Sequence, residues 1–124
     1  MGYAPASISN LTITSTAEYK LYSDIAVYGD FILTSGIFNG NGYSVALGDN
    51  SADLISISGT YKFGAGGVLM PCSGSSVIVN AGGTIEVVGT GISNAIVTNN
   101  PFFGGRYDFV VNGTIHANYY QFTI

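Results

Sequence analysis

The sequence predicts an all-β protein, a short parallel β-helix (β-solenoid) of about four coils. Three observations support this: a five-residue phrase that occurs four times, alternation of apolar and polar residues beside it, and 18 glycines that punctuate the chain at short intervals. Closely spaced turns also fit a β-sandwich or jelly roll. The repeated phrase favours the solenoid.

The phrase consists of glycine, then Asp or Thr, then an apolar residue, any residue and a second apolar residue. Its copies are Gly29–Leu33, Gly59–Phe63, Gly83–Val87 and Gly113–Ala117, and the middle interval between their glycines is shorter than the other two. A coil of three strands of about five residues, joined by connections of about two to six, needs roughly 20–30 residues. All three intervals fall in this range, so we expect each phrase to mark one coil.

Alternating segments adjoin the phrases at 25–28, 55–58, 77–81 and 109–112. A period of two places Ile25, Val27 and Phe31 on one face of the chain, and Tyr28 and Asp30 on the other. The first face is expected to form the core and the second to meet water. No segment shows the apolar spacing of a helix.

The two outermost segments, Ala6–Ile13 and Tyr120–Ile124, alternate in the same way and carry no charged or proline residue. An uncapped strand edge presents unpaired N–H and C=O groups that favour pairing with another chain. The sequence therefore predicts association between copies, by stacking coils or exchanging a terminal strand. Either an open filament or a closed oligomer would result.

Composition supports one domain over residues 1–124 and excludes some partners. Charged residues make up 8% of the chain, and 13 Ser, 10 Thr and 10 Asn supply most of its small polar surface. With a net charge of −4 there is no basic cluster for nucleic acid. The chain also lacks the run of about 18 apolar residues that a membrane helix needs, and it has no signal-peptide pattern. Both a mature chain and a piece of a longer β-helix fit these features.

The sequence predicts no catalytic residue and no cofactor site. Glycosidases need two carboxylates about 5–10 Å apart, but the acidic residues occupy different offsets from the repeat phrase. They are Glu18, Asp24, Asp30, Asp49, Asp53, Glu86 and Asp108. The lone His116 falls on an outward strand position with no acidic or nucleophilic neighbour in sequence, which indicates a solvated side chain.

No metal site is predicted either. Asp49 and Asp53 flank one turn and could offer oxygen ligands to Ca²⁺, yet they lack the denser pattern of a calcium loop, and solvated turn residues are the favoured interpretation. The single Cys72 excludes an internal disulfide and is expected to be a semi-buried turn residue. The run Gly64–Gly67 is interpreted as a loop, because no lysine or helix start follows it as in a phosphate loop.

Aromatic residues are abundant, with nine Tyr and seven Phe. An aromatic ladder inside the coil is the favoured interpretation, ahead of an interface with another subunit or stacking on sugar rings. Tyr28 is expected to point outward and Tyr43 to share the inward phase of Val45 and Leu47.

Two segments, Ile25–Gly42 and Val111–Phe122, resemble the glycine-punctuated repeats of large bacterial cell-surface parallel β-helix proteins. The resemblance implies a right-handed coil, secretion and a surface or adhesive role, and it transfers no functional residues. This chain departs from those proteins in length, since they are several times longer.

The predicted function is therefore that of a structural or adhesive protein outside the cell or at its surface, not an enzyme, that forms a homo-oligomer or filament. The alternative is a carbohydrate-binding or polysaccharide-processing module that contacts surface glycans. A third hypothesis is an ice-binding face, based on Thr12-Ile13-Thr14, but this motif does not recur in each coil.

Overall fold

The computed structural model describes residues 6–47, 53–98 and 106–123, which form sixteen β-strands and no helix. Thus no helix in these ranges could cross a membrane.

The strands fall into three parallel sheets, here called A, B and C. Sheet A contains β1 (Ala6–Ile8), β4 (Ile25–Val27), β7 (Ser44–Leu47), β10 (Val68–Pro71), β13 (Ala95–Val97) and β16 (Tyr120–Phe122). Sheet B contains β2 (Leu11–Ile13), β5 (Phe31–Leu33), β8 (Leu54–Ile57), β11 (Ser76–Val79) and β14 (Asp108–Val111). Sheet C contains β3 (Glu18–Lys20), β6 (Ile37–Asn39), β9 (Thr60–Lys62), β12 (Thr84–Val88) and β15 (Thr114–Asn118).

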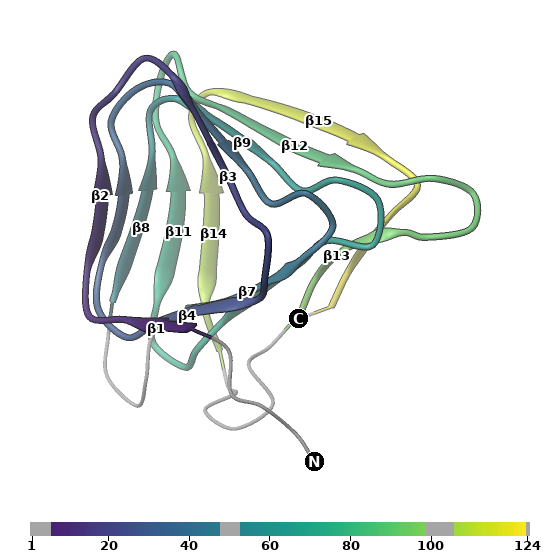
Figure 1. Cartoon of the computed structure of the whole chain (residues 1–124), viewed down its shortest axis with the longest axis horizontal. Helices are drawn as coiled ribbons and strands as arrows, with labels where there is room; N and C mark the ends of the chain where they lie inside the picture. Colours follow the sequence, from purple (N-terminus) through teal and green to yellow (C-terminus); the bar gives the residue numbers. More distant parts are fainter. Residues whose placement is uncertain (1–5, 48–52, 99–105, 124) are drawn as a thin grey trace.

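Each strand pairs in parallel with the strand three places along the chain, so successive turns of backbone stack on one another. Figure 1 shows the strands of sheet B side by side, from the purple β2 at one edge to the yellow β14 at the other. This arrangement is a parallel β-solenoid, and it confirms the fold class predicted from the sequence.

The core follows from the alternation within each strand. Phe31, Ile55 and Val77 occupy equivalent inward positions in β5, β8 and β11, and all three are fully buried. The predicted aromatic ladder is present in sheet C. There Phe38 lies between Tyr19 and Tyr61, with ring centroids 5.8 and 5.0 Å away.

The repeat phrase marks the turns less regularly than predicted. Gly59, Gly83 and Gly113 each lead into a strand of sheet C, but Gly29 leads into β5 of sheet B. The interval from Gly29 to Gly59 is therefore longer than one turn, and the prediction of one coil per phrase is wrong for the first copy. The same short phrase starts a strand on either sheet because it specifies a bend followed by two inward apolar residues.

Measured along sheet C, turn length increases from the first turn to the last. In sheet C the first turn runs from Glu18 of β3 to its partner Ile37 of β6, and the last runs from Thr84 of β12 to its partner Thr114 of β15, a much longer stretch of chain. Part of the increase lies in β12 and β15, which span five residues where β3, β6 and β9 span three. Another part lies in the segment between β12 and β13, which extends beyond the neighbouring turns in Figure 1.

Glycine is required where sheet B bends into sheet C. A Cβ on Gly113 would lie 2.3 Å from the carbonyl oxygens of Asn80 and Gly83 in the turn before. A Cβ on Gly83 would likewise lie 2.3 Å from the Ile57 carbonyl oxygen. Only a residue without a side chain lets successive corners approach this closely.

Candidate functional site

Sheet C carries a row of polar side chains on its outer face. Parallel pairing places Asn39, Lys62, Glu86 and His116 at the same position in β6, β9, β12 and β15. Successive strands lie about 4.8 Å apart, so these side chains form a ladder along the solenoid axis.

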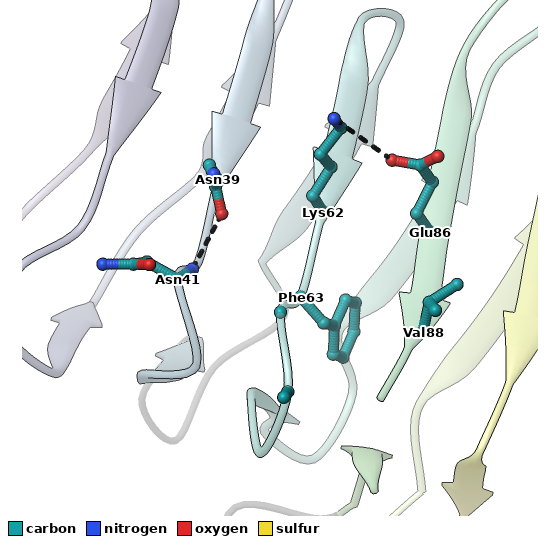
Figure 2. A pocket seen from close by; sticks show the side chains of 8 residues that line it. Asn39, Asn41, Lys62, Phe63, Glu86 and Val88 are labelled. Atoms are coloured by element: carbon teal, nitrogen blue, oxygen red, sulfur yellow. Dashed lines mark hydrogen bonds and ion pairs between the residues drawn. The ribbon is translucent and has the colours of Figure 1, made fainter. Parts of the chain in front are cut away.

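A groove of about 530 Å³ opens beside this ladder. We call it the sheet C groove; its lining residues are Asn39, Asn41, Lys62, Phe63, Gly64, Ala65, Glu86 and Val88. Figure 2 shows Lys62 and Glu86 reaching toward each other, with Val88 beyond them on the same strand as Glu86. The groove lies where the strands of sheet C lengthen from three residues to five.

Glu86 is the electrostatic centre of the ladder. Its Oε2 lies 3.8 Å from Lys62 Nζ, and its Oε1 lies 3.7 Å from His116 Nδ1. Both distances exceed those of strong hydrogen bonds, so the carboxylate and the ammonium keep capacity for other partners. The arrangement offers acceptors and donors side by side.

Sequence reasoning did not bring these side chains together, although a signal was available. Lys62, Glu86 and His116 each occupy the fourth position of their copy of the phrase, and residues at one phrase position in one sheet must stack. His116 is exposed, as expected, but Glu86 lies beside it across the strand pair. Sequence adjacency alone therefore missed its acidic neighbour.

Two of the candidate carboxylates serve the fold. Asp24 Oδ1 accepts a hydrogen bond from the Ser44 amide, and Asp30 Oδ1 accepts one from the Leu54 amide. In the same way, Asn10 Oδ1 accepts from the Asp30 amide. Each side chain thus binds the start of a strand in the following turn. We call this set of three contacts the Asx ladder.

The remaining carboxylates are dispersed. Glu18 Oε2 accepts from Asn39 Nδ2 at 3.3 Å, Asp108 is exposed at the start of β14, and Asp53 is partly buried beside β8. Asp49 lies outside the described residues, so the calcium hypothesis for Asp49 and Asp53 stays a hypothesis. Within the described ranges, no three His, Cys, Asp or Glu side chains are grouped as metal ligands would be.

Cys72 is more deeply buried than the sequence suggested, with no exposed surface. Its Sγ lies 2.9 Å from Ser75 Oγ, a hydrogen bond that either group can donate. The glycine run forms the turn between β9 and β10, where Gly67 N–H donates to the Gly64 carbonyl. Positive φ angles at Gly64 and Gly66 account for the glycines there.

The tyrosines divide between core and surface. Tyr28 is exposed as predicted, but Tyr43 is also 37% exposed, which corrects its predicted inward position. Tyr43 precedes β7 and follows Asn41 and Gly42, both at positive φ, so the strand alternation does not extend back to it. Tyr61 is buried, and burial raises the pKa of its phenol.

Threonines form a row on sheet C and not on sheet B, where Thr12 lies in β2. Thr12 in β2 pairs with Ile32, so its row is interrupted after one turn. Thr60, Thr84 and Thr114 instead stack in consecutive turns. The charged ladder lies two positions further along the same strands, so this face is not the uniform threonine surface that the ice-binding hypothesis needs.

Comparisons with protein-family models, with curated proteins and with solved structures find no match to this chain. The solenoid is established by the strand pairing itself. The resemblance to bacterial surface proteins stays a hypothesis.

Proposed function

We propose that this chain is a structural or adhesive protein of the cell surface or extracellular space, and that copies of it associate through the ends of the solenoid. The observation that carries the proposal is the edge formed by β14, β15 and β16. Each of these strands has one hydrogen-bonded neighbour among the described residues, namely β11, β12 and β13. Their other edges offer backbone groups for pairing with another chain.

Side chains on this edge support the same function. Val111 and Ile115 occupy inward positions and are 36% and 40% exposed. Burying them against another chain would remove apolar surface from water, at about 25 cal/mol per Å². The outer faces, with few charges and many Ser, Thr and Asn, are suited to a passive structural surface.

Sedimentation over a range of protein concentrations, together with electron microscopy, tests the association. We expect a species larger than the monomer that weakens when Gln121–Ile124 is deleted. A stable monomer at high concentration, unchanged by the deletion, would contradict the proposal. Antibody labelling of intact source cells tests the location, and signal only after permeabilisation would contradict a surface role.

The sheet C groove favours a second candidate function, the binding of a neutral saccharide. The groove offers a carboxylate, an ammonium and amide groups that can bond sugar hydroxyls, and Val88 provides an exposed apolar wall. Lys62 and Glu86 balance each other in charge, which suits an uncharged ligand.

NMR titration with neutral oligosaccharides tests this candidate. We expect shifts of the Lys62 and Glu86 amides that weaken in Glu86→Gln, while Asp108→Asn, an exposed carboxylate outside the groove, leaves them unchanged. Equal responses in the two variants, or no shift at millimolar sugar, would exclude the groove as the binding site.

A further inference from the structure

The two ends of the solenoid differ in how well their apolar interior is covered. At the last turn, Val111 and Ile115 are substantially exposed, although their partners in the turn before, Val79 and Ile85, are fully buried. At the first turn, Ile13 of the edge strand β2 is only 7% exposed, and the inward side chain that is exposed on β3 is the aromatic Tyr19, at 43%. Exposed aliphatic surface on the inward phase is therefore concentrated at the last turn.

Within sheet C, charge separates the two ends in the same direction, although in sheet B the edge strand β14 carries Asp108 and β2 carries no charge. The edge strand β3 carries Glu18 and Lys20, and charged residues on an edge oppose pairing with another strand. Its counterpart at the other end, β15, has the sequence Thr-Ile-His-Ala-Asn, with no Asp, Glu, Lys or Arg. The first turn is thus protected on sheet C, whereas the last turn is not.

Size separates them as well. In sheet C, β15 spans five residues against three in β3. Head-to-tail stacking would place β15 on the shorter β3 and leave part of β15 without a partner. β15 of a second copy matches it in length.

We propose that two copies meet through their last turns about a two-fold axis, with β15 antiparallel to β15 of the second copy. This inference rests on the proposed self-association and specifies its geometry. β15 is suited to the central position because all five of its residues are exposed. An isologous contact of this kind closes after two subunits, so it yields a dimer and no filament.

Symmetry fixes a register for the contact. With the axis through His116, Thr114 faces Asn118 of the second copy, and Ile115 faces Ala117. In this register, inward-facing residues of one copy lie beside inward-facing residues of the other. The large side chain of Ile115 packs against the small side chain of Ala117. Each His116 lies opposite the His116 of the other copy.

Cysteine crosslinking tests this register. Opposed residues of antiparallel strands have Cα atoms about 4.5–5.5 Å apart, within the range of a disulfide. On mild oxidation with diamide, His116→Cys should form a covalent dimer on a non-reducing gel. Lys20→Cys, placed on the edge strand of the first turn, is the matched control and should stay monomeric. The native Cys72 is buried and contributes no background.

Sedimentation of the unmodified chain and of Ile115→Lys completes the test, with circular dichroism as a check that the variant folds. We expect the unmodified chain to form a dimer that does not assemble further as concentration rises. The dimer should be absent in Ile115→Lys, and His116→Cys should crosslink it. Polymers that lengthen with concentration, or crosslinking through position 20, would overturn the two-fold contact while leaving self-association standing. A monomer at every concentration would overturn both.

Discussion

Val79 in β11 and Val111 in β14 occupy the same position in successive turns of sheet B, yet Val79 is fully buried and Val111 is 36% exposed. The same contrast holds in sheet C between Ile85 and Ile115. Residue type and strand phase are the same in each pair, and every member packs on a buried side chain of the turn before. The difference lies in the turn that follows, which covers the first member and is absent from the second among the described residues.

This contrast teaches that a side chain in a solenoid depends on two layers, the one before it and the one after it. An interaction made only with the preceding layer should contribute as much to the free energy of unfolding in the last turn as in the middle turns. An interaction that requires the following layer should contribute less in the last turn. Substitutions in the middle and last turns distinguish these two kinds of interaction.

The largest difference is expected between Ile85→Ala and Ile115→Ala. Truncation at 85 leaves a cavity in a packed core and should lower the free energy of unfolding by about 3 kcal/mol, whereas truncation at 115 should cost about 1 kcal/mol. Guanidinium unfolding of dilute protein measures both, because dilution removes any contribution from self-association. Equal losses would show that the last turn is covered in the dilute chain.

Corner glycines should show no such difference. A Cβ at Gly83 or at Gly113 would collide with carbonyl oxygens of the preceding turn, so Gly83→Ala and Gly113→Ala should each destabilise by about 1–3 kcal/mol. Gly91→Ala is the control, since its Cβ would meet only the Tyr119 ring at 3.7 Å. Thermal unfolding of the three variants measures whether Gly83→Ala and Gly113→Ala lose the same stability and whether Gly91→Ala loses less. A harmless Gly113→Ala would mean that the last corner is more loosely packed than the middle ones.

The Asx ladder depends on the following turn. Asp30→Ala removes the acceptor of the Leu54 amide and should cost about 1 kcal/mol, while Asp30→Asn keeps a side-chain oxygen and should cost less. Asp108 starts β14 in the last turn, so Asp108→Ala should stay within about 0.5 kcal/mol of the parent. Urea unfolding compares the three. If Asp108→Ala lowered the free energy of unfolding as much as Asp30→Ala, the stabilisation by these side chains would not depend on an amide in the following turn.

The smallest effect is expected for the ion pairs of Glu86. A double-mutant cycle with Lys62→Gln and Glu86→Gln should give a coupling below about 1 kcal/mol that decreases with added salt, because both side chains are partly exposed. The cycle with His116→Gln extends the measurement to the last turn. Coupling that resists high salt would indicate a drier groove than the structure shows.

The sequence was sufficient to predict the solenoid and the inward phase of Ile25, Val27 and Phe31, because these follow from a period of two and from local composition. It was insufficient for the register between turns. Gly29 and Gly59 begin the same phrase but lead into strands of different sheets, and no local sequence feature distinguishes the two copies. The number of residues per turn also changes from one coil to the next, so spacing alone does not give the register.

The candidate site was harder to predict for the same reason. Glu86 and His116 are distant in the sequence and become neighbours only once Thr84 is known to pair with Thr114. In the sequence, Asp24 and Asp30 are candidates for carboxylate chemistry, whereas in the structure their oxygens accept hydrogen bonds from amides one turn further along. Their role is not visible until it is known which strand starts beside them.

The Asx ladder also has a direction. Asn10 accepts from Asp30, and Asp30 accepts from Leu54, so in each case the earlier turn holds the acceptor and the later strand brings the donor. A chain that emerges amino-terminus first, from a ribosome or a translocation pore, would present a prepared acceptor before the matching amide arrives. The hydrogen bonds of this ladder can therefore form one turn at a time as the chain emerges, although each layer is fully buried only when the next turn covers it.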